Sequence, residues 1–494
     1  MEMMLISVCL AIFLAFLFLK PLFTRTTTNK LKLPPSPWRL PVIGNLHQLS
    51  LHPHRSLRSL SLRYGPLMLL HFGCVPTLVV STADVAHDIM KTHDLKFSNR
   101  PRTRTVKKLI KGTEIAFAPY GEYWRHMKSI CVMNLLTNKT IRSFENTRTE
   151  EINLLMGKLE KASSSSSPVN LSKLFINFSN DVITRVVLGK KYSSEGGEYI
   201  SQNVVRKFME LVGAFPLGDF IPKLAWIEKI RGLDKKVEEV YKEIDGFLEK
   251  AVQDHENADE ERSDFVYMLL SVQRDKTAPF EFERRDLKFV LLDMLFGAAT
   301  TTFALLEWTM TELMRHPECM KKLKDEICSI STHRLYVTEE EAEKMNYLNL
   351  VVKEALRLHP GVPIAPRQLS EDVKVHGYDI AAGTQVLINI WAIQRDISAW
   401  GPDAEEFKPE RHLDTVVDFQ GQNLKFIPFG SGRRQCPGSG YVVALVEVTL
   451  ANLVKRFDWK VDVGAMGDDK PDLTDAIGID VCRKYPLIVC PSSV

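Results

Sequence analysis

The distribution of apolar and polar residues divides the chain into regions of different character. Met3–Leu19 is an apolar run broken only by Ser7, about as long as the shortest helices that span a bilayer. Leu67–Val80 is rich in residues that favour short strands. Helical patterning then continues to about Leu358, and extended segments return near Val373–Ile390 and at the C-terminus. The pattern predicts a mainly α fold with small β-sheets made from distant parts of the chain.

The longest apolar stretch outside the N-terminal run is Phe289–Met314. A second membrane span is a poor interpretation of it, because it carries Asp293, Glu307 and Glu312 together with five threonines. We therefore expect this stretch to form a long helix through the core of the folded domain.

Two polar runs, Ser163–Ser167 and Asp254–Arg262, interrupt the helical region. Their composition predicts solvated loops between helices. The chain contains no internal repeat, and its strands come from distant segments. We therefore expect residues 38–494 to form one domain.

The charges around the first apolar run indicate a membrane anchor that stays in the protein. The run begins after Glu2 and is followed by Lys20 and Arg25, so the positive-inside rule places everything downstream in the cytosol. A cleaved signal peptide, the rival interpretation, would need a basic start and small residues at its end. The sequence predicts an anchor at residues 1–23 and a polar, proline-rich hinge at residues 24–37.

Composition and charge narrow the class of protein further. Of the 494 residues, 45% are hydrophobic and 25% are charged, as in an ordinary globular protein with a large core. The net charge is only +3, and the basic residues are spread along the chain without forming one tract, so no nucleic-acid partner is indicated. The eight cysteines form no C-x-x-C pair, which argues against a zinc site and a disulfide framework.

The sharpest chemical signal is the segment Pro428–Gly438, which reads Pro-Phe-Gly-Ser-Gly-Arg-Arg-Gln-Cys-Pro-Gly. Its glycines permit a tight turn around Cys436, and Pro437 fixes the exit of the chain. A metal ion bound to this thiol would deprotonate it, and backbone N–H groups of the turn could hydrogen-bond the sulfur. The alternative is a buried structural cysteine in a glycine-rich loop.

This segment matches the pattern F-x-x-G-x-R-x-C-x-G and resembles the haem-binding loop of the cytochrome P450 family. The resemblance extends over essentially the whole chain. It implies the P450 fold and haem b as the cofactor, with the thiolate of Cys436 as the metal ligand and with Phe429 and Gly438 beside the haem.

Two further motifs of the resemblance concern a structural network. Glu354 and Arg357 match the family's E-x-x-R motif, and Arg411 matches the arginine of its P-E-R element. Together they imply a buried network of one carboxylate and two guanidinium groups. Taken alone, E-x-x-R usually means a surface ion pair.

The resemblance also implies four side chains that hold the haem propionates. Trp124 and Lys128 match the family's W-x-x-x-R helix, and Arg367 and Arg434 match its other propionate-binding positions. Lys128 stands where Arg is usual, so the charge is kept while bidentate geometry is lost. The alternative for each basic residue is a solvated surface cation.

The usual activity implied by the resemblance is monooxygenation, since a thiolate ligand favours O–O cleavage. Such chemistry needs protons, which the family delivers through an acid–alcohol pair on the core helix. Thr301 matches the alcohol, but Thr300 stands where Asp or Glu is usual, and Ala298 where Gly is usual. The proton-shuttling carboxylate is therefore missing.

Three functions stay open after this departure. The first is monooxygenation with a proton relay that depends on water and Thr301. The second is an oxygen-independent lyase, because relatives with the same layout are dehydratases that convert aldoximes to nitriles at haem iron. The third is a weakly catalytic haem protein that acts through partners.

Several segments indicate which branch of the family the chain resembles. Leu40–Leu46, Phe117–Gly121 and Phe407–Arg411 are similar to those of plant A-type enzymes of the 71 clan, most closely a 71A-like subfamily common in crucifers. Members act on small specialised metabolites such as oximes, terpenoids and phenolics. The resemblance therefore implies a small hydrophobic or oxime-type substrate.

The resemblance places a substrate pocket along five stretches of the chain. These are Arg102–Phe117, Phe208–Phe215, Asp293–Thr302, Gly361–Ala365 and Ala476–Ile479. The residues singled out to line the pocket are Phe117, Phe296, Gly297, Val362 and Ile477. Phe296 is bulky where relatives often carry a small residue, and so is Val442 behind the haem, so either could reshape the cavity. The alternative for each residue is ordinary core packing.

Electrons must come from a partner, because the chain has no G-x-G-x-x-G fingerprint and no length left for a flavin domain. The resemblance implies NADPH–cytochrome P450 reductase, docked on the cysteine side through a basic surface around Arg433 and Lys128. It also implies a single-pass protein of the endoplasmic reticulum membrane whose catalytic domain faces the cytosol. The glycosylation sequons at Asn138, Asn170 and Asn177 are then expected to be unmodified.

Overall fold

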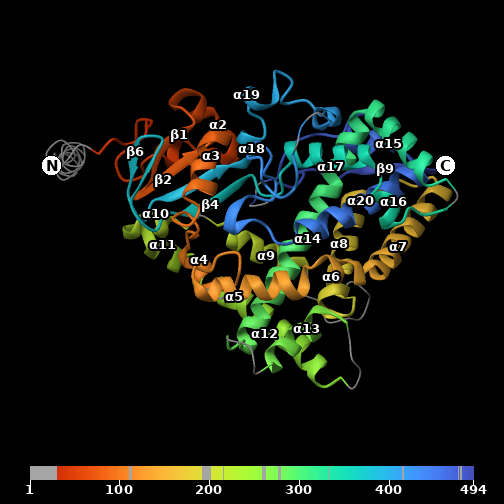
Figure 1. Ribbon diagram of the computed structural model, residues 1–494, viewed down its shortest axis with the longest axis horizontal. Helices are drawn as coiled ribbons and strands as arrows, with labels where there is room; N and C mark the ends of the chain where they lie inside the picture. The colour runs from red at the N-terminus through yellow and green to blue at the C-terminus, as the bar shows by residue number, and fades with distance from the viewer. Residues whose placement is uncertain are drawn as a thin grey trace, which may run out of the picture.

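The computed structural model describes residues 31–110, 114–191, 202–214, 216–258, 263–275, 280–332, 334–413, 415, 417–476, 478 and 481–494. The predicted anchor and the first part of the predicted hinge lie outside these residues, and so does Ile477. Figure 1 shows the main sheet at the end of the molecule that carries the N-terminus, with helices over the rest. The mainly helical fold with small sheets predicted from the sequence is confirmed.

The bounds of the elements follow in chain order. The helices are α2 (Pro53–Tyr64), α3 (Ala83–His87), α4 (Arg104–Ile110), α5 (Glu122–Ile130), α6 (Asn138–Ser143), α7 (Glu145–Ser164), α8 (Leu171–Leu188), α9 (Gln202–Val212), α10 (Leu217–Phe220), α11 (Ala225–Ile230), α12 (Leu233–Glu256), α13 (Phe265–Arg274), α14 (Arg284–Arg315), α15 (Pro317–Ile330), α16 (Glu339–Ala342), α17 (Asn346–Leu358), α18 (Ile390–Ile393), α19 (Ile397–Trp400), α20 (Ser439–Arg456) and α21 (Val463–Met466). The strands are β1 (Leu67–Phe72), β2 (Val75–Val80), β3 (Val169–Asn170), β4 (Ile364–Gln368), β5 (Val373–Val375), β6 (Tyr378–Ile380), β7 (Gln385–Asn389), β8 (Phe457–Val461) and β9 (Ile488–Ser493).

The largest sheet joins four strands in the order β1-β2-β7-β4. β1 and β2 form an antiparallel hairpin in which Leu67 pairs with Val80. β2 then runs parallel to β7, with Thr77 opposite Gln385. Parallel neighbours cannot be joined by a tight turn, and here the connection between them contains most of the helices. The sheet therefore ties the two ends of the helical region together.

α14 is the long core helix predicted at Phe289–Met314. It begins with a capping box formed by Glu283 and Asp286, and apolar side chains are buried along its whole length. By length and composition it is apolar enough to cross a membrane, but 67% of its apolar window is buried inside the protein. It contacts α8, α13, α17 and α20 and runs through the middle of the molecule (Figure 1).

The two loop predictions are partly wrong at their first residues. The serine run begins inside α7, which ends at Ser164, and the charge run begins inside α12, which ends at Glu256. His255 explains the longer α12, because its buried ring lies 2.6 Å from the Ala251 carbonyl and 3.0 Å from the Asp264 carboxylate. This tertiary contact stabilises the last turn of α12, where the polar sequence alone predicts a loop.

From Lys32 onward, the predicted hinge lies against the strands. Lys32 donates its backbone N–H to Asp379 Oδ2 (2.9 Å), and its carbonyl accepts from the Asp379 N–H (2.7 Å). The Pro35 carbonyl accepts from the N–H of Leu69 on β1 (2.9 Å). The chain is thus fixed to the sheet region before it reaches Trp38.

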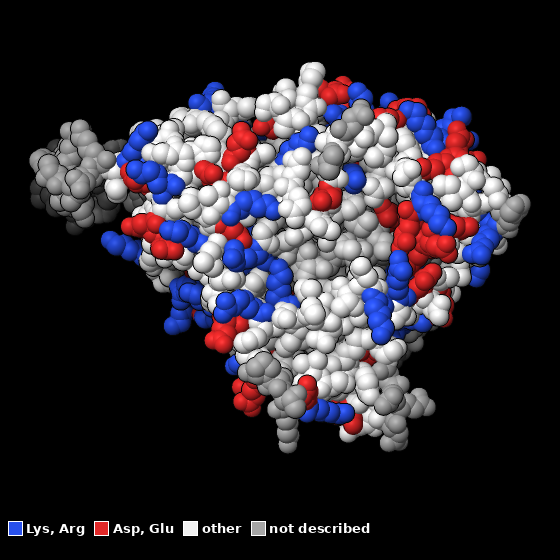
Figure 2. Space-filling model, in the orientation of Figure 1, with Lys and Arg blue, Asp and Glu red and all other residues white. Residues whose placement is uncertain are grey.

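Charges of both signs are interspersed on the surface. Figure 2 shows basic and acidic side chains mixed on the left and right parts of one face, with a largely uncharged band between them. The mixture agrees with the small net charge of +3.

Candidate cofactor and substrate site

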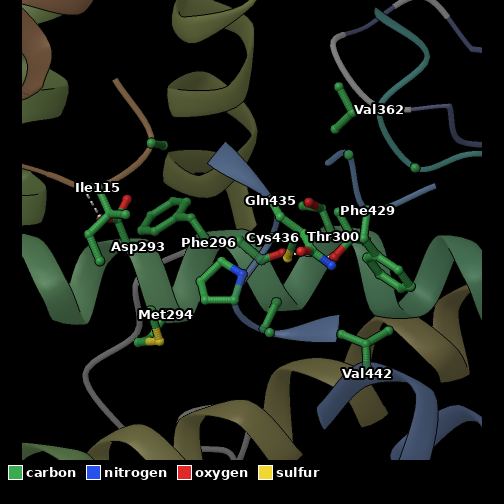
Figure 3. A pocket seen from close by; sticks show the side chains of 18 of the residues that line it. Ile115, Asp293, Met294, Phe296, Thr300, Val362, Phe429, Gln435, Cys436 and Val442 are labelled. Carbon is green, nitrogen blue, oxygen red and sulfur yellow. Dashed lines mark hydrogen bonds between the residues drawn. The ribbon is translucent and has the colours of Figure 1, made fainter. Parts of the chain in front are cut away.

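A cavity of about 420 Å³ lies between the Pro428–Gly438 loop and α14. Figure 3 shows Cys436 on the loop and Asp293, Phe296 and Thr300 along the helix. Of the residues predicted for the site, those that line the cavity are Phe117, Trp124, Lys128, Phe296, Gly297, Thr300, Thr301, Val362, Arg367, Phe429, Arg434, Cys436, Gly438 and Val442. The structure therefore brings together the singled-out cofactor and pocket residues that it describes, whereas Ala476 and Gly478, the described residues of the fifth predicted stretch, lie outside the cavity lining.

Phe296 shapes the wall of the cavity on the side of α9. Its ring packs against that of Phe208, with the two ring centroids 4.6 Å apart. Phe208, Met209 and Val212 of α9 also line the cavity. The bulky side chain at position 296 therefore closes the space between α14 and α9 with an aromatic pair.

The backbone around Cys436 adopts the tight turn expected of its glycines. Gly432 has φ of +69°, and a Cβ added there would lie 2.6 Å from the Met90 carbonyl oxygen. Glycine is therefore required at this position by both conformation and space. The Cys436 N–H donates to the Phe429 carbonyl (2.9 Å), and the thiol side chain is exposed in the cavity. The turn thus presents the sulfur to whatever fills the cavity.

Burial raises the pKa of the Cys436 thiol, while hydrogen bonding from the Gly438 backbone and the charge of Lys128 act in the opposite direction. A thiol with a raised pKa stays protonated at neutral pH unless a metal ion replaces the proton. The site therefore suits a cysteine that becomes a thiolate on binding a metal.

Arg100, Arg367 and Arg434 all line the cavity and are called the arginine cluster below. Arg367 and Arg434 are buried, and Arg100 is partly buried. Arg434 donates to three backbone carbonyls, those of Ser98, Ile115 and Ala118. Arg367 is only 2% exposed, and its Nη2 lies 3.3 Å from a backbone carbonyl. Arg367 Nη1 and Arg100 Nε have no partner among the described residues. Buried donors without acceptors are costly, so the described residues alone leave the cluster incomplete.

Nearby carboxylates do not balance the burial of the arginine cluster: Glu114 acts on Arg100 and Arg434, and Asp94 acts on Arg367, but the pKa values of all three guanidinium groups remain lowered. Burial lowers the pKa of Arg100 to about 10 and that of Arg434 to about 9. Burial together with the charges of these two neighbours lowers the pKa of Arg367 as well. Carboxylate groups of a ligand would supply both the missing acceptors and the missing negative charge.

Trp124 and Lys128 lie on α5 beside the cluster, and both already have protein partners. The Trp124 indole N–H donates to the Ile115 carbonyl (2.9 Å), and the Arg434 guanidinium lies 4.4 Å from its ring centre. Lys128 Nζ donates to the Arg433 carbonyl (2.6 Å), which uses one of its three donors. Trp124 therefore supports Arg434 through its ring, and Lys128 keeps donors for an anionic group.

These observations agree with the binding of haem. A thiol faces the cavity, unpaired guanidinium donors lie at one side of it, and most of the remaining lining is apolar. A flat, largely apolar iron macrocycle with carboxylate substituents needs this set of contacts. The residues present fit the group, with Cys436 toward the iron and the arginine cluster and Lys128 toward the propionates.

The cavity side of α14 carries two hydroxyl groups with different surroundings. The Thr301 hydroxyl donates to the Gly297 carbonyl one turn earlier (2.7 Å). Thr300 Oγ1 is buried and has no partner among the described residues. No carboxylate among the described residues is hydrogen-bonded to either hydroxyl group, so we expect hydroxyl groups and water molecules to carry protons at this part of the helix.

Two carboxyl groups within the predicted pocket stretches, Glu114 and Asp293, also line the cavity, although neither was singled out from the sequence. Asp293 Oδ2 accepts from the Ile115 N–H (2.6 Å, dashed in Figure 3), and Glu114 accepts from the Phe117 N–H at 2.8 and 2.9 Å. Burial raises the pKa of Glu114 to about 7, and burial with the charge of Glu114 raises that of Asp293 well above its usual value. Asp293 thus ties the loop before α5 to α14.

The structure also places Glu354, Arg357 and Arg411 together, away from the cavity lining. Arg357 donates to both oxygens of Glu354 at 2.8 Å, and Arg411 Nε donates to Glu354 Oε1 at 2.8 Å. Glu354 and Arg357 are 0% exposed. His412, which the sequence reasoning missed, adds a contact of 2.9 Å to Glu354 Oε2. Opposite charges lower the pKa of Glu354 to about 2 despite its burial.

The basic residue missed at the site is Arg100. It lies two positions before the predicted pocket stretch that begins at Arg102, and this proximity was the only sequence signal for it. Its role depends on the fold, because its Nη1 donates to the Pro366 carbonyl on β4 (2.5 Å), beside Arg367.

Comparisons with known proteins agree with this geometry. The family model described as Cytochrome P450 matches residues 34–483. Cytochrome P450 71A14 and Cytochrome P450 71A20 of Arabidopsis thaliana are 60% and 61% identical to this chain. A third Arabidopsis thaliana protein, named indoleacetaldoxime dehydratase, is 60% identical. Each of these alignments covers 100% of this chain and 100% of the relative.

Proposed function

The chain belongs to the cytochrome P450 family as a haem monooxygenase of the plant 71A-like type, and we propose that it oxidises a small, hydrophobic plant specialised metabolite. In this proposal O2 is the oxidant, and NADPH–cytochrome P450 reductase supplies the electrons. The observation that carries it is the largely apolar cavity enclosed between Cys436 and the hydroxyl groups of α14. Such a cavity takes a small apolar molecule and presents one part of it to the reacting centre.

Each residue of the site has a role in this proposal. Bound haem supplies a thiolate-ligated iron at which O2 is activated. Cys436 holds the iron, and the Gly438 backbone hydrogen-bonds the sulfur. The arginine cluster and Lys128 neutralise the propionates and fix the orientation of the ring. The aromatic pair of Phe296 and Phe208 excludes water from the side of α9.

Proton delivery in this proposal depends on hydroxyl groups. Thr301 holds its hydrogen on the Gly297 carbonyl, so its oxygen remains an acceptor that can order a water molecule in the cavity. The unpaired hydroxyl of Thr300 can hold a second one. Both groups lack the acidity of a carboxyl, so we expect slower proton delivery than an acid at position 300 would give.

An oxygen-independent aldoxime dehydratase is the second candidate. Two observations favour it: Thr300 stands in place of an acid, and a relative 60% identical over its full length is named indoleacetaldoxime dehydratase. Dehydration of an aldoxime to a nitrile has no net need for O2 or for the missing carboxylate.

One experiment separates the two candidates. The full chain is co-expressed with a plant reductase in microsomes and offered oximes and plant extract fractions, with and without NADPH, under heavy-isotope oxygen gas. Labelled, NADPH-dependent products support the monooxygenase. Unlabelled nitriles formed without O2 support the dehydratase, and a normal haem spectrum with no turnover of any compound contradicts both.

The role of Cys436 has its own test. Cys436→Ser is expected to abolish the thiolate-type spectrum of the reduced carbon monoxide complex. Cys328→Ser, at an exposed cysteine outside the cavity lining, is the matched control and is expected to keep it. A normal thiolate spectrum in Cys436→Ser contradicts the assignment.

We also propose that residues 1–23 anchor the protein in the endoplasmic reticulum membrane, with the catalytic domain on the cytosolic side. The support is the apolar run and the basic residues that follow it. The sequons at Asn138, Asn170 and Asn177 should then carry no glycan. Protease digestion of intact microsomes combined with a glycosidase shift assay tests this, and a glycan on any of the three reverses the orientation.

A further inference from the structure

One carboxyl oxygen of Asp293 is unused by the described residues. Its Oδ2 accepts the Ile115 N–H, whereas its Oδ1 has no hydrogen-bond partner among the described residues. The residue is shielded from bulk solvent but keeps part of its surface open where it lines the cavity, unlike the buried Leu295. Figure 3 shows its side chain at the same wall as Phe296. A carboxyl oxygen is thus available to a molecule in the cavity.

Its place on α14 sets where such a molecule makes contact. Asp293, Gly297, Thr300 and Thr301 all line the cavity and follow one another at helical spacing, so they share one face of α14. Asp293 precedes Thr300 by two turns, which is about 10 Å along the helix axis. A group bound to Asp293 therefore lies at the end of the substrate farthest from the residues beside the reacting centre.

We propose that Asp293 hydrogen-bonds a hydroxyl group at this far end, and so selects elongated apolar molecules that carry a hydroxyl at one end. The inference rests on the proposed function, for which it names a substrate class. The wall between the two ends includes Met294, Phe296 and Phe208, which suits an apolar body.

The surroundings favour a hydroxyl over an ammonium group. A hydroxyl both donates and accepts, so it satisfies the carboxyl whether ionised or neutral, whereas an ammonium satisfies only the ionised form. Burial and the nearby Glu114 favour the neutral form, because they raise the pKa of Asp293. Arg434 and Arg102 act on Glu114 from nearby, and their charges further disfavour a cationic ligand.

The test compares 4-hydroxybiphenyl with biphenyl, which differ only in a terminal hydroxyl. Binding of both probes to full-length holoenzyme in nanodiscs is measured by titration calorimetry. The hydroxyl is expected to improve affinity about tenfold, the effect of one buried hydrogen bond. In Asp293→Val the two probes should bind with about equal affinity. The affinity for biphenyl shows whether the substitution has also changed the shape of the cavity.

Two further variants complete the design. Asp293→Asn keeps an acceptor for Ile115 and groups that can bind a hydroxyl, so it should keep the preference. Asp286→Asn is the matched control on the same helix, because that carboxyl bonds Tyr123 and the Glu283 N–H outside the cavity lining. It should also keep the preference.

Three results overturn the inference: no preference in the unchanged protein, a preference that survives Asp293→Val, or one that is lost in Thr300→Val instead. These measurements need neither O2 nor electrons. A chain that fails to oxidise any substrate can therefore still show the preference, and an active monooxygenase can lack it, so the two proposals fail separately.

Discussion

Two regions of this protein bury guanidinium groups, and they differ in where the negative charge comes from. Around Glu354, two arginines and His412 converge on a carboxylate that belongs to the chain. Arg357 donates from all its nitrogens to Glu354 or to the carbonyls of Gln394, Ala404 and Glu406. In the arginine cluster, by contrast, Arg367 Nη1 and Arg100 Nε lack acceptors among the described residues.

The difference separates a structural element from a binding site. A buried network that satisfies its own charges stabilises the fold and needs no ligand. A buried cluster with unpaired donors costs free energy until a ligand supplies acceptors, so its residues are kept for binding rather than for stability. Substitutions in the two regions should therefore act on different quantities, folding in the first and haem affinity in the second.

The largest expected effect is that of Glu354→Ala. It leaves Arg357, Arg411 and His412 buried without their carboxylate, which should cost about 3–5 kcal/mol of the free energy of unfolding. Denaturant unfolding of the haem-free and haem-loaded protein measures this, and both forms should lose stability equally. Glu340→Ala, in an exposed pair with Lys344, is the control and should change little. An equal loss of unfolding free energy in Glu354→Ala and Glu340→Ala would contradict a stabilising role of the buried network.

The pH dependence of stability should differ between the regions. The pKa of Glu354 is lowered to about 2 in the fold, so its contribution of about 3 kcal/mol is complete above the ordinary carboxyl pKa and is lost as pH falls from about 4.5 toward 2. The pKa of Glu114, beside the arginine cluster, is raised to about 7, so its contribution is lost as pH rises from about 4.5 to 7. The free energy of unfolding, measured as a function of pH, should vary less between about pH 2 and pH 4.5 in Glu354→Gln. It should vary less between about pH 4.5 and pH 7 in Glu114→Gln.

Arg367→Met tests the binding role of the arginine cluster. Removal of an unpaired buried charge should leave the stability of the haem-free protein unchanged or raise it. Haem affinity should fall about tenfold or more, because a charge-assisted contact to a propionate is lost. Titration of the haem-free protein with haem, beside denaturant unfolding, measures both quantities. A loss of haem-free stability as large as that of Glu354→Ala is the contrary result.

The smallest expected effect is that of Lys128→Arg. A guanidinium can bind a carboxylate through two parallel hydrogen bonds, whereas the ammonium of Lys128 acts as a point charge. Haem release to an acceptor protein should therefore slow by a few fold, and the free energy of unfolding of the haem-free protein should not change. Lys128→Met removes the charge, so haem release from it should be faster. Faster release from Lys128→Arg as well argues against a propionate contact.

The parts of the site that could be predicted from the sequence are those encoded by short spacing. The turn around Cys436 depends on glycines within a few residues, and Glu354 and Arg357 share a helix face three residues apart. These features depend on local backbone geometry, which a sequence motif records directly. The same holds for α14, whose length and apolar character are visible in the sequence.

The parts that could not be predicted depend on contacts between distant segments. The Asp293 carboxyl meets the Ile115 N–H across 178 positions of the chain, and Arg100 meets the Pro366 carbonyl across 266. No spacing rule links such positions, because their proximity arises only from the packing of α14 and the sheet. The end of α12 is a further example, because His255 contacts Asp264, the N-cap residue of α13.

The parallel pairing of β2 with β7 also sets the timing of assembly. β2 leaves the ribosome long before β7, and at synthesis rates of about 5–20 residues per second the wait is on the order of tens of seconds. During this time the edge of the β1–β2 hairpin has no partner, and unpaired edges attract other chains. Cys436 is made later still. During synthesis the first sheet is therefore open before β7 is made, and, with Cys436 as the proposed iron ligand, we expect haem to bind only after most of the chain has been made.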